Sequence, residues 1–200
     1  MARHTPRIGG FTLIEMLVTI VLMSILMALA FPSMSAWIRN SRIRAAGDTL
    51  QNALRLAQSE ALRRSRQTVF SLTNSATPST SLTAVANGRN WSINTVRMMT
   101  DDAANVAPFV ESGVLATTSS DVQITGPAAI CFNSLGRLVV NSDTKVTGGN
   151  CTTATATQYD ITVSNANADT RPLRVLVALG GQVRMCDPAK ALATYPDGCP

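Results

Sequence analysis

Gly10-Phe11-Thr12-Leu13-Ile14-Glu15 opens an apolar stretch that continues to Phe31, and this stretch decides the fold. Polar side chains interrupt it at four positions only, Thr12, Glu15, Thr19 and Ser24. About twenty helical residues, each rising about 1.5 Å, match the roughly 30 Å thickness of a bilayer's hydrocarbon core. The stretch therefore predicts a membrane-spanning helix over residues 11–31.

The basic residues before this helix predict its orientation. Arg3, His4 and Arg7 precede it with no acidic residue among them. An excess of positive charge holds a flanking segment in the cytoplasm, so the rest of the chain is expected outside it. A secretory signal cleaved after Ala30 is the alternative, because Ala28-Leu29-Ala30 has the small-x-small form of a cleavage site. The apolar run is longer than the usual signal core, and Glu15 would lie inside that core.

The string from Gly10 to Glu15, preceded by a short basic leader, resembles the type IV pilins and the pseudopilins of type II secretion. The resemblance implies that residues 1–10 are a prepilin leader. It also implies that a prepilin peptidase cuts between Gly10 and Phe11 and methylates the new amino group of Phe11. The protein would then be a single-pass protein of the bacterial inner membrane, with its N-terminus cytoplasmic and its head periplasmic, before it enters a pilus or pseudopilus.

Glu15 requires a partner on physical grounds, because an ionised acid among Ile14, Met16 and Leu17 is costly away from water. Helical spacing puts Glu15 one turn from Phe11. The amino group freed at Phe11, in the same subunit or in a filament neighbour, is the expected cation. Such a pair would set axial register, as a buried polar group does in a coiled coil. The alternative is an acid near the membrane edge that reaches the headgroups.

The helix is expected to continue to about Arg66, with a kink at Pro32, because proline removes one backbone hydrogen bond. Residues 32–66 form its amphipathic half. Apolar residues recur there at steps of three and four, at Ile43, Ala46, Leu50, Ala53, Leu54, Ala57 and Ala61.

Residues 67–200 change in composition and predict a β-rich head, which makes the chain an α+β protein. The expected strands are Gln67–Leu72, Trp91–Met98, Val122–Thr125, Ala129–Phe132, Arg137–Val140, Tyr159–Ser164, Leu173–Leu179 and Gln182–Met185. Residues 74–83 and 141–157 read as polar loops, and Gly180-Gly181 reads as a hairpin turn.

The segment from Leu54 to Ala61, Leu-Arg-Leu-Ala-Gln-Ser-Glu-Ala, is similar to a segment of the GspH/FimT family of minor pilins and pseudopilins. That resemblance covers residues 46–66 with the following strands. It implies a head built as a β-sandwich of two antiparallel sheets packed against the helix.

The four cysteines, Cys131, Cys151, Cys186 and Cys199, all lie in the head, which is expected in an oxidising periplasm, so disulfides are predicted. Three pairings are possible. We favour Cys131–Cys151 and Cys186–Cys199, because each joins neighbours across a polar loop. A zinc site is the alternative, but there is no Cys-x-x-Cys pair.

The single histidine, His4, lies in the leader, which removes the common catalytic arrangements from the mature chain. Ser-His-Asp and Cys-His nucleophiles and a histidine general base are excluded. Asp101-Asp102 reads as an exposed turn better than as a catalytic pair. We expect no enzyme activity, no cofactor and no metal.

The segment Gly181–Pro188 resembles the C-terminal region of FimT-type pilins, where a Gly-Arg-x-Arg motif is implicated in DNA capture. Gly181 and Arg184 match, but Gln182 replaces the first arginine, so only Arg184 is carried over as a DNA-binding candidate. Four other cations would assist if the fold gathers them: Arg137, Arg171, Arg174 and Lys190. The alternative for Arg184 is an outward-facing strand residue.

Together these observations predict a low-abundance structural subunit of a type IV pilus or type II secretion pseudopilus. The resemblance implies other pilins or pseudopilins, a prepilin peptidase and an inner-membrane assembly platform as partners, and membrane lipid before assembly. The head would prime assembly or form the tip. The alternatives are a DNA receptor at a pilus tip and a soluble periplasmic protein that begins at Phe31.

Overall fold

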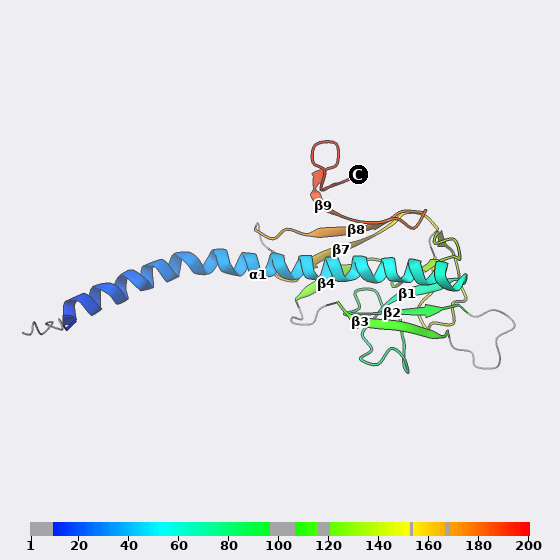
Figure 1. Ribbon diagram of the computed structural model, residues 1–200, viewed down its shortest axis with the longest axis horizontal. Helices are drawn as coiled ribbons and strands as arrows, with labels where there is room; N and C mark the ends of the chain where they lie inside the picture. Colours follow the sequence, from blue (N-terminus) through cyan, green and yellow to red (C-terminus); the bar gives the residue numbers. More distant parts are fainter. Residues whose placement is uncertain (1–9, 97–106, 116–120, 153, 167–168) are drawn as a thin grey trace, which may run out of the picture. The chain divides into compact units, whose positions relative to one another are not determined.

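One long helix and a β-rich head make up the part of the chain that the computed structural model describes, residues 10–96, 107–115, 121–152, 154–166 and 169–200 (Figure 1). Residue contacts divide the chain into two units, 1–38 and 39–200. The helix, α1, runs from Leu13 to Arg64 and contributes to both. The fold class is α+β, as expected.

The first unit contains the first half of α1. By length and composition this helix could cross a membrane, and the most apolar 18-residue window has none of its residues buried. The backbone stays helical through Pro32, so the proline does not end the helix. A kink at Pro32 remains a prediction.

The second unit holds two five-stranded sheets, counted over the described residues. The first has the order β3-β2-β1-β5-β6 and is antiparallel throughout. Its strands are β1 (Thr68–Thr73), β2 (Asn90–Thr95), β3 (Phe109–Val114), β5 (Ala129–Phe132) and β6 (Leu138–Val139).

The second sheet has the order β10-β9-β8-β7-β4. Its strands are β4 (Val122–Thr125), β7 (Thr157–Val163), β8 (Leu173–Val177), β9 (Val183–Ala191) and β10 (Gly198–Cys199). All its pairs are antiparallel except β9 with β10, which is parallel.

The second half of α1 shares one apolar core with both sheets, and Figure 1 shows it lying alongside β7 and β8 and alongside β1 and β2. Its buried residues are Gly47 and the seven apolar residues expected from the spacing, Ile43, Ala46, Leu50, Ala53, Leu54, Ala57 and Ala61. The two sheets meet directly where the rings of Phe70 in β1 and Tyr159 in β7 pack edge to face, with centroids 6.2 Å apart.

Gly47 allows α1 to lie close to the second sheet. A Cβ at this position would be 2.8 Å from Sδ of Met185 and 3.4 Å from Cδ1 of Ile161. A larger side chain would therefore require the side chains of Met185 and Ile161 to shift.

Two disulfides, Cys131–Cys151 and Cys186–Cys199, join all four cysteines in the favoured pairing. The first links β5 to the end of the segment that follows β6. That segment covers the outer face of the first sheet, where Val69, Cys131 and Val146 belong to a second, smaller apolar cluster. The second disulfide ties β9 to β10.

The expected strands agree with the structure within a few residues, with two omissions and one extension. The predicted strand Trp91–Met98 ends at Thr95 as β2, and its residues 97 and 98 lie outside the described part of the chain, as do leader residues 1–9 and Asp101-Asp102. Strands β3 and β10 were not predicted. The strand expected at Gln182–Met185 is β9, which continues past Pro188 to Ala191.

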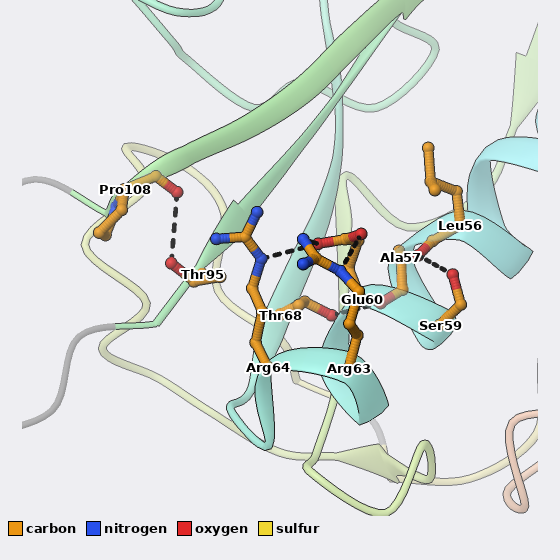
Figure 2. Close-up of polar contacts among 9 residues, drawn as sticks. All are labelled: Leu56, Ala57, Ser59, Glu60, Arg63, Arg64, Thr68, Thr95 and Pro108. Carbon is orange, nitrogen blue, oxygen red and sulfur yellow. Dashed lines mark hydrogen bonds and ion pairs between the residues drawn. The ribbon is translucent and has the colours of Figure 1, made fainter.

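Glu60 closes the last turns of α1 by pairing with two arginines (Figure 2). Arg63 donates to both carboxylate oxygens at 2.9 and 2.7 Å, and Nε of Arg64 donates at 2.7 Å. Hydrogen bonds from Arg63 and Arg64 lower the pKa of Glu60 from 4.5 to about 2. One turn away, the Thr68 hydroxyl donates to the carbonyl of Ala57 at 2.8 Å, which joins β1 to the helix.

Leu54→Ala should lower the free energy of unfolding by about 2–5 kcal/mol, because Leu54 is fully buried between α1 and the sheets. Asn52→Ala, on the exposed side of the same helix, is the control and should change it by no more than about 0.5 kcal/mol. Urea unfolding of the full chain in detergent, followed by tryptophan fluorescence, measures both. Equal effects would contradict the placement of this helix face in the core.

Glu60→Gln should destabilise the protein by about 1 kcal/mol at pH 7, a value kept small because Arg63 and Arg64 are 64% and 38% exposed. The stabilisation by ionised Glu60 is complete above pH 4.5 and is lost as the pH falls through about 2. The difference in unfolding free energy between wild type and variant should therefore vanish near pH 2. A difference that persists at that pH would show that shape, not charge, is responsible.

Candidate functional site

The start of α1 is the candidate assembly site, and Thr12 caps it. The amide of Glu15 donates to the Thr12 hydroxyl oxygen at 3.3 Å, and the amide of Met16 donates to the Thr12 carbonyl at 3.2 Å. Thr12 is thus the residue before the first helical residue, Leu13, and Glu15 is the third residue of the helix. Thr-x-x-Glu at these positions is the sequence pattern of a capping box.

This geometry corrects one expectation about Glu15. Helical residues begin at Leu13, so Phe11 lies before the helix and is not placed one helical turn from Glu15. The expected spacing therefore gives no support to a pair within one subunit. A partner from a neighbouring subunit is unaffected by this correction.

The sequence analysis did not predict that Thr12 caps the helix, although Thr12-x-x-Glu15 is a sequence pattern of helix starts. An acid in the first turn also interacts favourably with the positive end of the helix dipole. Glu15 thus has a local structural role besides any intermolecular one.

The residues around the expected cleavage point are accessible. Gly10 and Phe11 are exposed, Phe11 to 79%, and no other heavy atom lies within 4 Å of a Cβ built on Gly10. The apolar side chains that follow are also exposed, including Leu13 at 84%. This segment presents apolar surface that nothing in the described part of the chain covers.

Three of the five candidate DNA-binding cations use their charged groups in contacts within the head. Arg174 pairs with Asp160 across β8 and β7 at 2.6 Å. Lys190 donates to Asp197 at 2.5 Å, and this hydrogen bond raises the pKa of Lys190. The guanidinium of Arg184 donates to the backbone carbonyls of Pro196 and Gly198.

The structure does not gather all five cations. The amide of Arg171 donates to the side chain of Asn40, whereas Arg137 follows Gly136, whose carbonyl accepts a hydrogen bond from Gln58. Asn40 and Gln58 are eighteen residues apart on α1, or about 27 Å at 1.5 Å per residue. Arg137 and Arg171 therefore lie at opposite ends of the head. Arg184 lies on the outer face of β9, opposite Leu176, as the alternative reading expected.

Metal ions in proteins are held by groups of histidine, cysteine, aspartate and glutamate side chains. No group of three or more of these side chains gathers among the described residues. The cysteine thiols are consumed by the two disulfides.

Comparison with known proteins agrees with this architecture. Residues 6–31 match the model of the prokaryotic N-terminal methylation motif, and residues 46–186 match that of type II transport protein GspH. No functionally curated protein matches the chain in sequence.

Two solved structures are similar to this chain, and the first supports the fold. The type IV minor pilin FimU of Pseudomonas aeruginosa is similar with a TM-score of 0.50 and 16% identity, over 75% of this chain and 92% of FimU. The minor pseudopilin EpsH of the Vibrio cholerae type 2 secretion system has a TM-score of 0.45 and 11% identity, over 74% of this chain and 99% of EpsH. The GspH match covers more than half of the chain, and the chain therefore belongs to the GspH family of minor pilins and pseudopilins.

Proposed function

We propose that the protein is a minor subunit of a type IV pilus or of a type II secretion pseudopilus, anchored by the first half of α1 in the inner membrane before assembly. The observation that carries the proposal is the exposed apolar surface from Phe11 to Phe31, interrupted by the single charge of Glu15. Such a surface requires lipid or other helices around it. Membership of the GspH family supplies the second environment, the helical core of a filament.

Assembly exchanges lipid contacts for contacts between helices. Apolar side chains lose little in this exchange, because lipid tails are as apolar as they are. An ionised carboxylate differs, because it has no suitable partner among acyl chains and is costly there. The methylated amino group of Phe11 in a neighbouring subunit is the cation that we propose for Glu15. The pair would select one axial register among many with similar apolar packing.

An assembly platform and an ATPase would extract the subunit from the membrane, and the head would prime the filament or lie at its tip. DNA capture receives less support. Arg174 and Lys190 are neutralised by Asp160 and Asp197, and Arg137 and Arg171 lie at opposite ends of the head. We therefore place the structural role before that of a DNA receptor.

The mature protein should begin at Phe11 and carry a methyl group on its amino terminus. Intact-mass spectrometry and N-terminal sequencing of the protein from membranes measure both features. A mature chain that begins at Phe31 would identify a cleaved secretory signal instead and contradict the anchor.

Glu15→Gln should leave the subunit in the membrane and lower its incorporation into filaments at least about tenfold, because glutamine keeps the capping box but removes the charge. Thr12→Ala is the matched control, since it removes the capping hydroxyl and keeps the carboxylate. Immunoblots of sheared filaments and of membranes give the ratio of incorporated subunit to subunit left in the membrane. If Thr12→Ala impairs incorporation and Glu15→Gln does not, assembly depends on the helix cap and not on the charge of Glu15, and register selection is wrong.

A further inference from the structure

Three exposed leucines lie at the end of the head where α1 ends. Leu62 in the last turns of α1 is 50% exposed, Leu135 in the β5–β6 turn is 73% exposed, and Leu179 in the β8–β9 turn is 41% exposed. We call Leu62, Leu135 and Leu179 the leucine surface. Exposed apolar groups gathered at one place often mark a site of interaction.

Backbone contacts hold the three segments together. The side-chain amide of Gln58 in α1 donates to the carbonyl of Gly136 at 3.0 Å. Gly181 approaches the same carbonyl so closely that a Cβ there would be 1.8 Å from the oxygen. A Cβ on Gly136 would lie 3.5 Å from Cδ1 of Leu62, and the amide of Leu138 donates to the Leu179 carbonyl at 3.0 Å.

The two turns are fixed in shape by their glycines. Gly136 and Gly181 have φ values of 73° and 87°, in the left-handed region that favours glycine. The amide of Gly181 also donates to the carbonyl of Ala178 at 2.8 Å. The leucines are therefore presented by packed turns and a helix end, which lowers the entropic cost of binding.

The charge around the leucine surface is strongly positive. The three segments, residues 55–66, 133–140 and 178–184, contain six arginines and one acid, Glu60. Glu60 is already bonded to Arg63 and Arg64. Arg55 and Arg184 donate to backbone carbonyls, which carry no formal charge. A protein that covers the leucines would lie in this positive potential, so a partner with negative charge around its contact surface is favoured.

We propose that the leucine surface, with its arginines, is a docking site for a subunit of the same filament that is a different protein from this chain and presents carboxylates around an apolar contact. This inference rests on the proposed function. A polyanion such as DNA fits the arginines but leaves three leucines unused, and no aromatic side chain for base stacking occurs in the three segments. Apolar contact at the centre with charge at the rim is the arrangement of a protein interface.

Photo-cross-linking in filament-producing cells tests this docking site in the full chain. A photoreactive amino acid at position 135 should cross-link another filament subunit, through a peptide that contains at least two carboxylates. The matched control is the same group at position 192, because Leu192 is also an exposed leucine, 39%, but lies in the C-terminal segment between β9 and β10. It should give no such product.

The charge requirement is tested in the same cells. Arg137→Glu should lower the yield of the position-135 product about tenfold, because an acid would then face the partner's acids. Arg89→Glu is the control and should leave the yield unchanged. Arg89 is also exposed, but it lies at the other end of the first sheet. The next residue, Asn90, pairs with Thr73 at the end of β1, whereas Thr68 at the start of β1 lies beside the last turns of α1.

Several results would overturn the proposal. The first is a position-135 cross-link to a second copy of this chain, or to DNA or lipid only. The second is the absence of any position-135 cross-link. The third is a cross-link yield that Arg137→Glu does not change. Sheared filaments from the same cells separate this failure from that of the proposed function. If the chain is found in the filaments but gives no position-135 cross-link, only the proposed docking site is wrong. If the chain never enters filaments and lacks a methylated Phe11, the proposed function is wrong too.

Discussion

Burial of one face of α1 against both sheets is the interaction on which the rest of the structure depends. Ile43, Leu50 and Leu54 are fully buried in the same core as Phe70 of the first sheet and Tyr159 of the second. Neither sheet would have a complete apolar interior without the helix, since the sheets and the helix contribute to one cluster. The helix that buries this stripe in the head is continuous with the segment that exposes apolar residues from Leu13 onward. The single helix α1 therefore joins the folded head to an exposed apolar segment, which requires lipid or other helices around it.

The sequence predicts the helix well because its signals are local. The steps of three and four from Ile43 to Ala61 named all seven buried hydrophobic residues of this helix face, and the limits were wrong by two residues at each end. At the N-terminal limit of the helix, Thr12 is the capping residue. Just after its C-terminal limit, Ser65 adopts a positive φ of 51°. These limits depend on single hydrogen bonds and backbone angles, which periodicity does not report.

The omitted strands show where sequence patterns fail. Strand β3 is an edge strand with half its residues exposed, so its Phe-Val-Glu-Ser-Gly-Val lacks the alternation of a half-buried strand. Strand β10 has two residues, and the Cys186–Cys199 disulfide ties it to β9. Proline is rare in the interior of a sheet, yet β9 continues through Pro188. In each case pairing with a neighbouring strand decides the structure, and the residue pattern of the strand alone does not report that pairing.

The same distinction applies to the candidate sites. The string from Gly10 to Glu15 is contiguous, so the sequence named it, but its capping geometry appears only when Thr12 and Glu15 are seen at the helix start. The leucine surface is made of three segments that are distant in the sequence, and Gln58 joins two of them through the Gly136 carbonyl. Gln58 also lies beside Gly181, since a Cβ there would be 2.3 Å from its Nε2. One helix residue thus fixes both turns relative to Leu62, and with them the position of the surrounding positive charge.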